Sequence, residues 1–120
     1  MDELQFLQSV ELVAGLDRDG ARRAAMATLV TLGERLGREG ADELAGSLPG
    51  GLREGLDGAP DAGEAFDAEE FVRRVAARVD TAPDQAGRQA RAVVATLKED
   101  VAAVDRLRDR LPPDYQDLFA

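Results

Sequence analysis

The chain has 120 residues, of which 24 are acidic and 15 basic, giving a net charge of −9 at pH 7. This charge repels phosphate backbones and anionic lipid headgroups, so nucleic acid and membrane surfaces are excluded as expected partners. There is no cysteine and no histidine, which excludes disulfides, thiolate or imidazole metal sites, and Ser/His or Cys/His nucleophilic chemistry. We therefore expect no catalytic residue, no metal site and no cofactor.

Length and composition predict a single all-α domain. The apolar fraction is 44% but the aromatic fraction only 4%, so the core is expected to consist of Leu, Val and Ala side chains, which favour closely packed helices. No apolar run approaches the ~18 residues of a membrane span. The acidic start Met1-Asp2-Glu3 is unlike the basic start of a signal peptide. A cytoplasmic location is the resulting expectation.

A first helix is predicted to begin at Asp2. Asp2 and Gln5 have the spacing of a capping box, and Met1 and Phe6 occupy the two positions of a hydrophobic staple. Gly15 is expected to end the helix. The residues expected on its buried face are Phe6, Leu7, Val10, Val13 and Ala14.

A second helix is predicted to begin at Asp17 or Asp19 and to stop at Gly37 and Gly40. Its apolar stripe is Ala21, Ala25, Thr28, Leu29, Leu32 and Leu36. The run 17–20, Asp-Arg-Asp-Gly, is similar to the opening of a calcium loop, but its glycine comes too early and Thr28 stands at the twelfth position instead of Glu. Helix capping is the better interpretation. A short helix over 41–48 and a new start at Pro49 follow.

The second half of the chain repeats the first. Six residues of the first half recur in order at a constant shift of 65 positions. They are Phe6, Val10, Ala21, Ala25, Thr31 and Leu32, which recur as Phe71, Val75, Ala86, Ala90, Thr96 and Leu97. Leu48-Pro49 recurs as Leu111-Pro112, a shift of 63. We expect one domain over 1–120, with repeat one at 1–56, an acidic Gly/Pro linker at 57–65 and repeat two at 66–120. About seven helices, with the repeats related by a pseudo-twofold axis and sharing one core, are predicted.

The second repeat lacks counterparts of Gly37 and Gly40. An apolar seam therefore predicts one long helix from about Pro83 to Leu111. The start of this repeat at Phe66 and Asp67 predicts a second staple and capping box, and residues 81–84 are expected to cap the next helix. A long helix would expose part of its seam, and the residues assigned to this candidate interaction surface are Val101, Val104, Leu107 and Arg108. A homodimer is one expected consequence.

Arginines of the second repeat form a candidate anion patch, which consists of Arg74, Arg78, Arg88 and Arg91. The preferred interpretation of these arginines is a solvated face on which Glu69 pairs with Arg73 and Asp84 with Arg88, each at i,i+4 spacing. The acidic residues Asp61, Glu64, Glu69 and Glu70 could form a carboxylate pair, but helix-start electrostatics explains them more simply. The sole lysine, Lys98, is expected to be a solvated cation.

The doubled pattern resembles a bacterial family known only as domain of unknown function twenty-two sixty-seven. The features that carry the resemblance are Phe-x-x-x-Val, an Asp/Pro cap before Ala-x-x-x-Ala, and a Leu-Pro-x-x-Leu or Leu-Pro-x-x-Tyr close, each occurring twice. The resemblance implies an all-helical, two-repeat cytoplasmic domain without an established activity.

Two functions follow as expectations. The first is a non-enzymatic protein-interaction or adaptor module that binds an unknown protein partner or a second copy through an apolar helix face. The second is a small-ligand or regulatory domain with a pocket between the two repeats.

Overall fold

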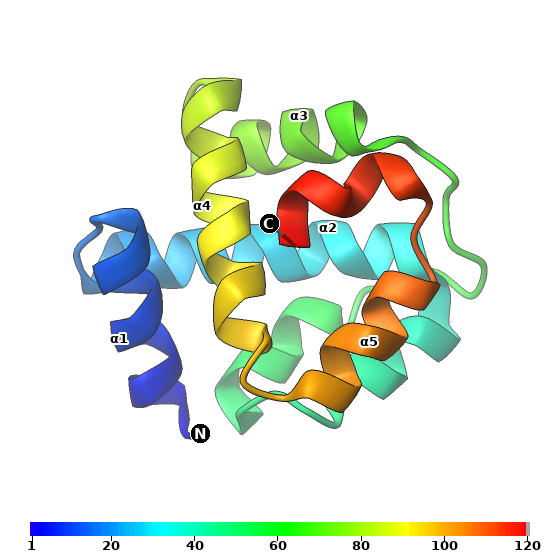
Figure 1. Cartoon of the computed structure of the whole chain (residues 1–120), viewed down its shortest axis with the longest axis horizontal. Helices are drawn as coiled ribbons and strands as arrows, with labels where there is room; N and C mark the ends of the chain where they lie inside the picture. The colour runs from blue at the N-terminus through cyan, green and yellow to red at the C-terminus, as the bar shows by residue number, and fades with distance from the viewer. Residues whose placement is uncertain (120) are drawn as a thin grey trace.

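The computed structural model describes residues 1–119, which form helices and no strand (Figure 1). Its elements are α1 (Glu3–Ala14), α2 (Arg18–Ala45), the 3₁₀ helix η1 (Gly50–Leu56), α3 (Ala68–Val79), α4 (Pro83–Leu97), α5 (Val101–Asp109) and the 3₁₀ helix η2 (Pro113–Phe119). The prediction of an all-α fold with about seven helices is confirmed.

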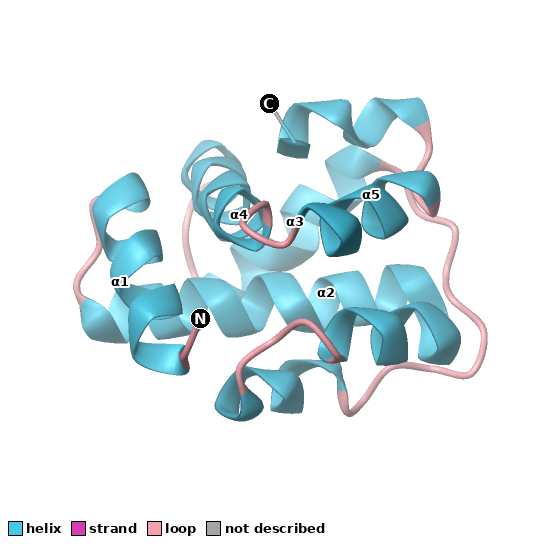
Figure 2. Ribbon diagram, turned by 60° about the horizontal axis from the view of Figure 1, so that its bottom comes forward, coloured by secondary structure: helices cyan, strands magenta, loops and turns pink. Residues whose placement is uncertain are grey.

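Two helices form the centre of the molecule. Helix α2 contacts α1, α3, α4, α5 and η1, and α4 contacts α1, α2, α3, α5 and η2. Helix α1 lies at one end of the molecule in both overall views (Figures 1 and 2). One hydrophobic core contains side chains of both halves, among them Phe6, Leu29, Leu52, Phe71, Val93 and Tyr115. Most of this core is Ala, Leu and Val, as the low aromatic content requires.

Element bounds repeat along the chain. Helices α1 and α3 span equivalent positions at a shift of 65, α2 and α4 begin at equivalent positions, and η1 and η2 coincide at a shift of 63. Gly15 and Asp80, which follow α1 and α3, both have left-handed backbone conformations. Thr31 and Thr96 each donate a hydrogen bond from Oγ1 to the carbonyl oxygen four residues earlier. A pseudo-twofold axis relating the two halves in space stays a prediction.

The predicted single helix from Pro83 to Leu111 is wrong. The chain leaves the helix after Leu97, and α5 begins anew with Asp100 as its N-cap, whose carboxylate accepts a hydrogen bond from the amide of Ala103 at 3.1 Å. This hydrogen bond lowers the pKa of Asp100 and stabilises the new helix start. The break lets α5 turn back against the core (Figure 1).

In the first repeat, helix α2 is interrupted only at Gly37. Gly37 has φ 83° and ψ 179° inside α2, whereas the helix continues through Gly40, so the predicted stop at Gly40 is wrong. The predicted linker packs against this break. The amide of Glu64 donates to the carbonyl of Glu34 at 2.9 Å, and Gly37 forms an isolated antiparallel bridge with Ala62. The linker thus bonds to backbone groups that the break removes from helical pairing.

Three local expectations need correction. Val13 was expected inside, but 62% of it is exposed. Asp67 caps α3 by accepting from the amide of Glu70, yet the Glu70 carboxylate binds arginines, so only half of the second capping box forms. Helix α4 begins at Pro83 without a side-chain cap. By contrast, the capping box of Asp2 and Gln5 is confirmed.

Candidate functional site

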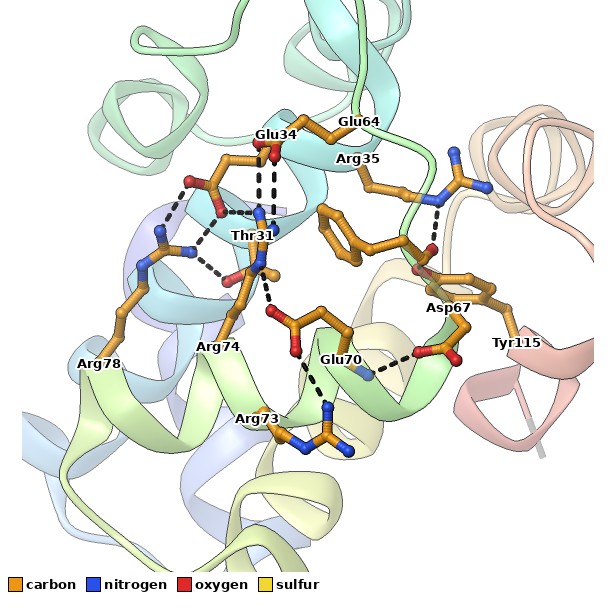
Figure 3. Close-up of polar contacts among 11 residues, drawn as sticks. Thr31, Glu34, Arg35, Glu64, Asp67, Glu70, Arg73, Arg74, Arg78 and Tyr115 are labelled. Carbon is orange, nitrogen blue, oxygen red and sulfur yellow. Dashed lines mark hydrogen bonds and ion pairs between the residues drawn. The ribbon is translucent and has the colours of Figure 1, made fainter.

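Arginine and carboxylate side chains join α3 to α2 and to the linker (Figure 3). Arg74 of α3 donates to Glu70 at 3.0 Å and to Glu64 of the linker at 3.2 Å. Arg78, one turn later, binds both carboxylate oxygens of Glu34 on α2, at 2.7 and 2.8 Å, and also donates to the hydroxyl of Thr31. Glu34 is shared, because Arg74 reaches it as well at 3.4 Å. The network therefore ties three segments together.

These contacts stabilise the charged forms of Glu34, Glu70 and Arg74. The hydrogen bond from Arg78 lowers the pKa of Glu34, and the positive charges of Arg78 and Arg74 add to this effect against the opposing effect of burial. Hydrogen bonds from Arg74 and Arg73 lower the pKa of Glu70. Bonds to Glu64 and Glu70 raise the pKa of Arg74. Because every charge has an opposite neighbour, the network is suited to holding helices together.

A second polar cluster fixes the start of α3. The carbonyl of Phe66 accepts hydrogen bonds from the Tyr115 hydroxyl at 2.7 Å and from Arg35 Nε at 2.9 Å (Figure 3). Burial raises the pKa of Tyr115. The carboxylate of Asp114 accepts from the amide of Ala68. Tyr115 is therefore a core residue whose hydroxyl donates to a backbone carbonyl.

The four arginines of the predicted anion patch do not converge. Arg74 and Arg78 belong to the ion-pair network between α2 and α3. Arg88 and Arg91 lie on α4, along an open groove of about 590 Å³ between α3 and α4. The candidate patch therefore does not form as one group, although Arg88 and Arg91 line the same groove.

The groove between α3 and α4 has a mixed lining. Helix α3 contributes Glu69, Val72 and Arg73, and the first half of α4 contributes Pro83, Asp84, Gly87, Arg88 and Arg91. The predicted ion pair between Glu69 and Arg73 forms, whereas Asp84 and Arg88 are not paired within residues 1–119. This groove lies inside the second repeat. A hollow between the repeats, lined in part by Phe6 and Leu97, measures about 210 Å³, below the usual ~300 Å³ of a ligand pocket.

Two of the four residues assigned to the candidate interaction surface are buried. Val104 and Leu107 are only 4% and 3% exposed and belong to the core, so their assignment to a surface is wrong. Val101 is exposed (68%), and the Arg108 guanidinium lies 4.9 Å from the centre of the Phe119 ring. The cause is the break before α5, which points the apolar side of this helix inward.

A different apolar surface lies on α1 and is hereafter the outer face of α1. Its members are Leu4, Gln5, Gln8, Leu12 and Val13, all of which are exposed. Four of the five large hydrophobic residues that are exposed in the described chain lie within residues 1–13. Sequence reasoning missed this face, although a signal was available, because four of the five positions 65 residues later carry charges where α1 has none.

Two acidic residues of the first repeat, Asp2 and Asp17, act as helix caps. Asp17 accepts a hydrogen bond from the amide of Gly20 at 2.7 Å, which is the capping geometry preferred above over a calcium loop. Within residues 1–119, no three or more His, Cys, Asp or Glu side chains are grouped so that they could hold a metal ion. No helix in this range is long and apolar enough to cross a membrane.

The structure is an all-helical domain. Ion pairs join α3 to α2 and to the linker, and the outer face of α1 carries no charged residue. A family model described as "Uncharacterized conserved protein (DUF2267)" matches residues 4–118. The chain belongs to this family, as the resemblance indicated. No curated protein matches the chain.

Proposed function

We propose that the protein is a non-enzymatic protein-interaction module that binds its partner through the outer face of α1. The observation that carries this proposal is the absence of charge from that face in a chain of which 32% is charged. Leu12 is 85% exposed and Leu4 51%. Depletion of charged residues is a compositional mark of the centre of protein interfaces.

Helix α3 serves as an internal comparison for the outer face of α1. Helix α3 spans the positions equivalent to α1 and buries equivalent residues, since Phe6 and Val10 correspond to Phe71 and Val75. The opposite faces differ in charge at four of five positions. At the positions of Leu4, Gln5, Gln8, Leu12 and Val13, helix α3 has Glu69, Glu70, Arg73, Ala77 and Arg78. The buried faces therefore reflect a common packing need, whereas the uncharged outer face belongs to α1 alone.

The position of this face and the charge of the chain favour a different protein over a second copy of the chain. Helix α1 lies at one end of the molecule (Figures 1 and 2), and the residues of its outer face are exposed. A partner with an apolar groove can enclose such a helix, as in helix-in-groove recognition. Two copies would bring together net charges of −9 each, which opposes self-association.

The residue inventory supports a role without catalysis. The chain has neither cysteine nor histidine. Its single lysine, Lys98, donates a hydrogen bond from its ammonium group to the carbonyl of Phe119. This contact occupies the group that Schiff-base chemistry would need.

Site-specific photocrosslinking in cells of the source organism tests the proposal. A photoreactive amino acid replaces Gln8 in the outer face, and in a matched control it replaces Arg73, the equivalent residue of α3. We expect a discrete adduct with one other protein from position 8 and none from position 73. Leu12→Glu is expected to abolish the adduct, whereas the matched Ala77→Glu leaves it intact.

Stability measurements separate binding from folding. Because Leu12 is almost fully exposed, Leu12→Glu should change the free energy of unfolding by less than about 0.5 kcal/mol. Equal adducts from positions 8 and 73, or an adduct that survives Leu12→Glu, would contradict the proposed surface. An adduct with the mass of two chains would contradict the choice of a different protein as partner.

A further inference from the structure

The groove between α3 and α4 contains two arginines that lack partners, and it lies outside the outer face of α1. Arg88 and Arg91 are exposed, three residues apart on α4, and line the groove together. Neither guanidinium makes a hydrogen bond or an ion pair with any residue of 1–119. Most other arginines bind carboxylates or backbone carbonyls, for example Arg78 with Glu34 and Arg23 with the carbonyl of Val79. In a chain with nine more acidic than basic residues, two neighbouring unpaired cations are unexpected.

The floor of the groove is a glycine that packing does not require. Gly87 is buried in the interior of α4, where glycine costs about 1 kcal/mol relative to alanine. A Cβ atom at this position would lie 3.5 Å from the Arg91 guanidinium and 3.9 Å from Val72, which are ordinary contacts. No backbone atom approaches closely. A methyl group would therefore fit at this position, and the glycine keeps the groove free of any side chain between Arg91 and Val72.

The first repeat has a long side chain at the position equivalent to Gly87. Arg22 stands 65 residues before Gly87, and its guanidinium bridges to Glu3 of α1 at 3.1 Å. At the position equivalent to Glu3, α3 has Ala68. The second repeat thus lacks both partners of the ion pair that spans its counterpart.

The charges of the lining indicate the kind of ligand. Glu69 is bound to Arg73. The remaining charges of the lining all lie on α4 and are the carboxylate of Asp84 and the guanidinium groups of Arg88 and Arg91, which gives a net charge of +1. Guanidinium groups bind phosphate and carboxylate groups through paired hydrogen bonds. Val72 and Gly87 offer an uncharged floor for the body of a small molecule. The volume of about 590 Å³ is in the range of small-molecule sites.

We propose that this groove binds a small organic anion, whose phosphate-monoester or carboxylate group contacts Arg88 and Arg91 and whose apolar body rests on Gly87 and Val72. The test is titration of the full chain with phenyl phosphate and with benzoate at constant ionic strength, followed by the NMR signals of the groove amides. Phosphate-monoester and carboxylate ligands are distinguished by which of the two probes binds more tightly. Inorganic phosphate measures the contribution of the anionic group without an apolar body.

Four variants are expected to change the affinity for the probes in different directions. Arg88→Gln with Arg91→Gln should weaken binding at least tenfold. Gly87→Leu should also weaken it by filling the floor. Asp84→Asn should tighten it severalfold by removing the opposing carboxylate. Arg106→Gln on α5 should leave it unchanged, since Arg106 also lacks a hydrogen-bonded partner within residues 1–119 but lines no part of this groove.

Two results would overturn the proposal. One is the absence of saturable shifts at the groove amides with either probe at tens of millimolar. The other is equal weakening by Arg106→Gln and by the Arg88 and Arg91 double variant, because general charge screening would then explain the response. Gly87→Ala is a check on folding, since it is expected to raise the melting temperature and to narrow the groove only slightly.

Discussion

Glu34 is the residue through which α2 holds α3. Its carboxylate binds Arg78 through both oxygens and is also within reach of Arg74, and its side chain is largely buried. Arg78 would lose its carboxylate partner if Glu34 were neutral, because its remaining bond is to the Thr31 hydroxyl. The contribution of the Glu34 carboxylate to the free energy of unfolding can therefore be measured from its pH dependence.

We expect Glu34→Gln to lower the free energy of unfolding at pH 7 by about 1 kcal/mol, allowing for partial solvent screening. The pKa of Glu34 is lowered in the folded chain, so this stabilisation is fully present above the ordinary glutamate pKa of about 4.3. It is lost as the pH falls through the lower folded value. The difference between wild type and variant should thus be full at pH 7 and vanish in strong acid.

Urea unfolding at several pH values measures this difference. Glu54→Gln is the control, because Glu54 is exposed and its side chain makes no ion pair within residues 1–119. A difference between wild type and Glu34→Gln that stays constant from neutral to acidic pH would contradict the assigned role of the carboxylate charge.

Contacts between residues far apart in the sequence could not be predicted from the sequence. The pair of Glu69 and Arg73 was predicted because i,i+4 spacing on a helix places the two side chains together. Glu34 and Arg78 are 44 positions apart, and only the packing of α3 on α2 brings them into contact. Arg78 was therefore assigned to an anion patch, although the structure neutralises it.

At the scale of elements, the break in α2 depends on one backbone conformation. Gly37 adopts φ 83° and ψ 179°, a region that is essentially restricted to glycine. A Cβ atom there would lie 2.5 Å from the backbone nitrogen of Gly63. The linker contacts α2 this closely because neither residue has a side chain.

We expect Gly37→Ala to destabilise the protein by about 3 kcal/mol, through backbone strain and the clash with the linker. The matched control is Gly58→Ala. Gly58 lies in the same linker, has no positive φ and would meet no atom within 4 Å of an added Cβ, so its replacement should change stability by less than about 0.5 kcal/mol. Chemical denaturation of both variants checks the expectation. Similar small effects at the two positions would show that the linker does not hold the break closed.

Helix starts and breaks were predictable where the signal is local. Asp2 and Gln5 form their capping box because both partners lie within one turn. The break before α5 also has a local signal, namely Asp100 as N-cap, but the apolar seam through Val101 and Val104 predicted a continuous helix. The prediction was wrong because Val104 packs into the core only after the chain has turned between α4 and α5. An apolar period does not say whether a helix continues or starts again in the same phase.

At the scale of the whole molecule, the two central helices come from different halves. Helix α2 belongs to the first half and α4 to the second, and they contact each other as well as their own neighbours. Leu29 of α2 and Val93 of α4 are fully buried in the same core. Each half alone would expose the side of its central helix that the other half covers.

We therefore expect neither half to fold alone. A cut between Gly58 and Ala59 gives fragments 1–58 and 59–120, each of about half the chain, and cores of this size rarely offset chain entropy. Circular dichroism should show little helix and no cooperative melting for either fragment. Mixing them should restore most of the helical signal, because the cut lies outside every helix, next to the exposed Gly58.

The concentration dependence of this recovery provides the decisive measurement. Assembly from two fragments is bimolecular, so the melting temperature of the mixture should rise with fragment concentration, whereas that of the intact chain should not. Gly37→Ala in fragment 1–58 should weaken reassembly, since residues 59–63 of the other fragment pack on this break. A cooperative melt of either fragment by itself would contradict the shared core, because it would show that one half can bury enough apolar surface without the other.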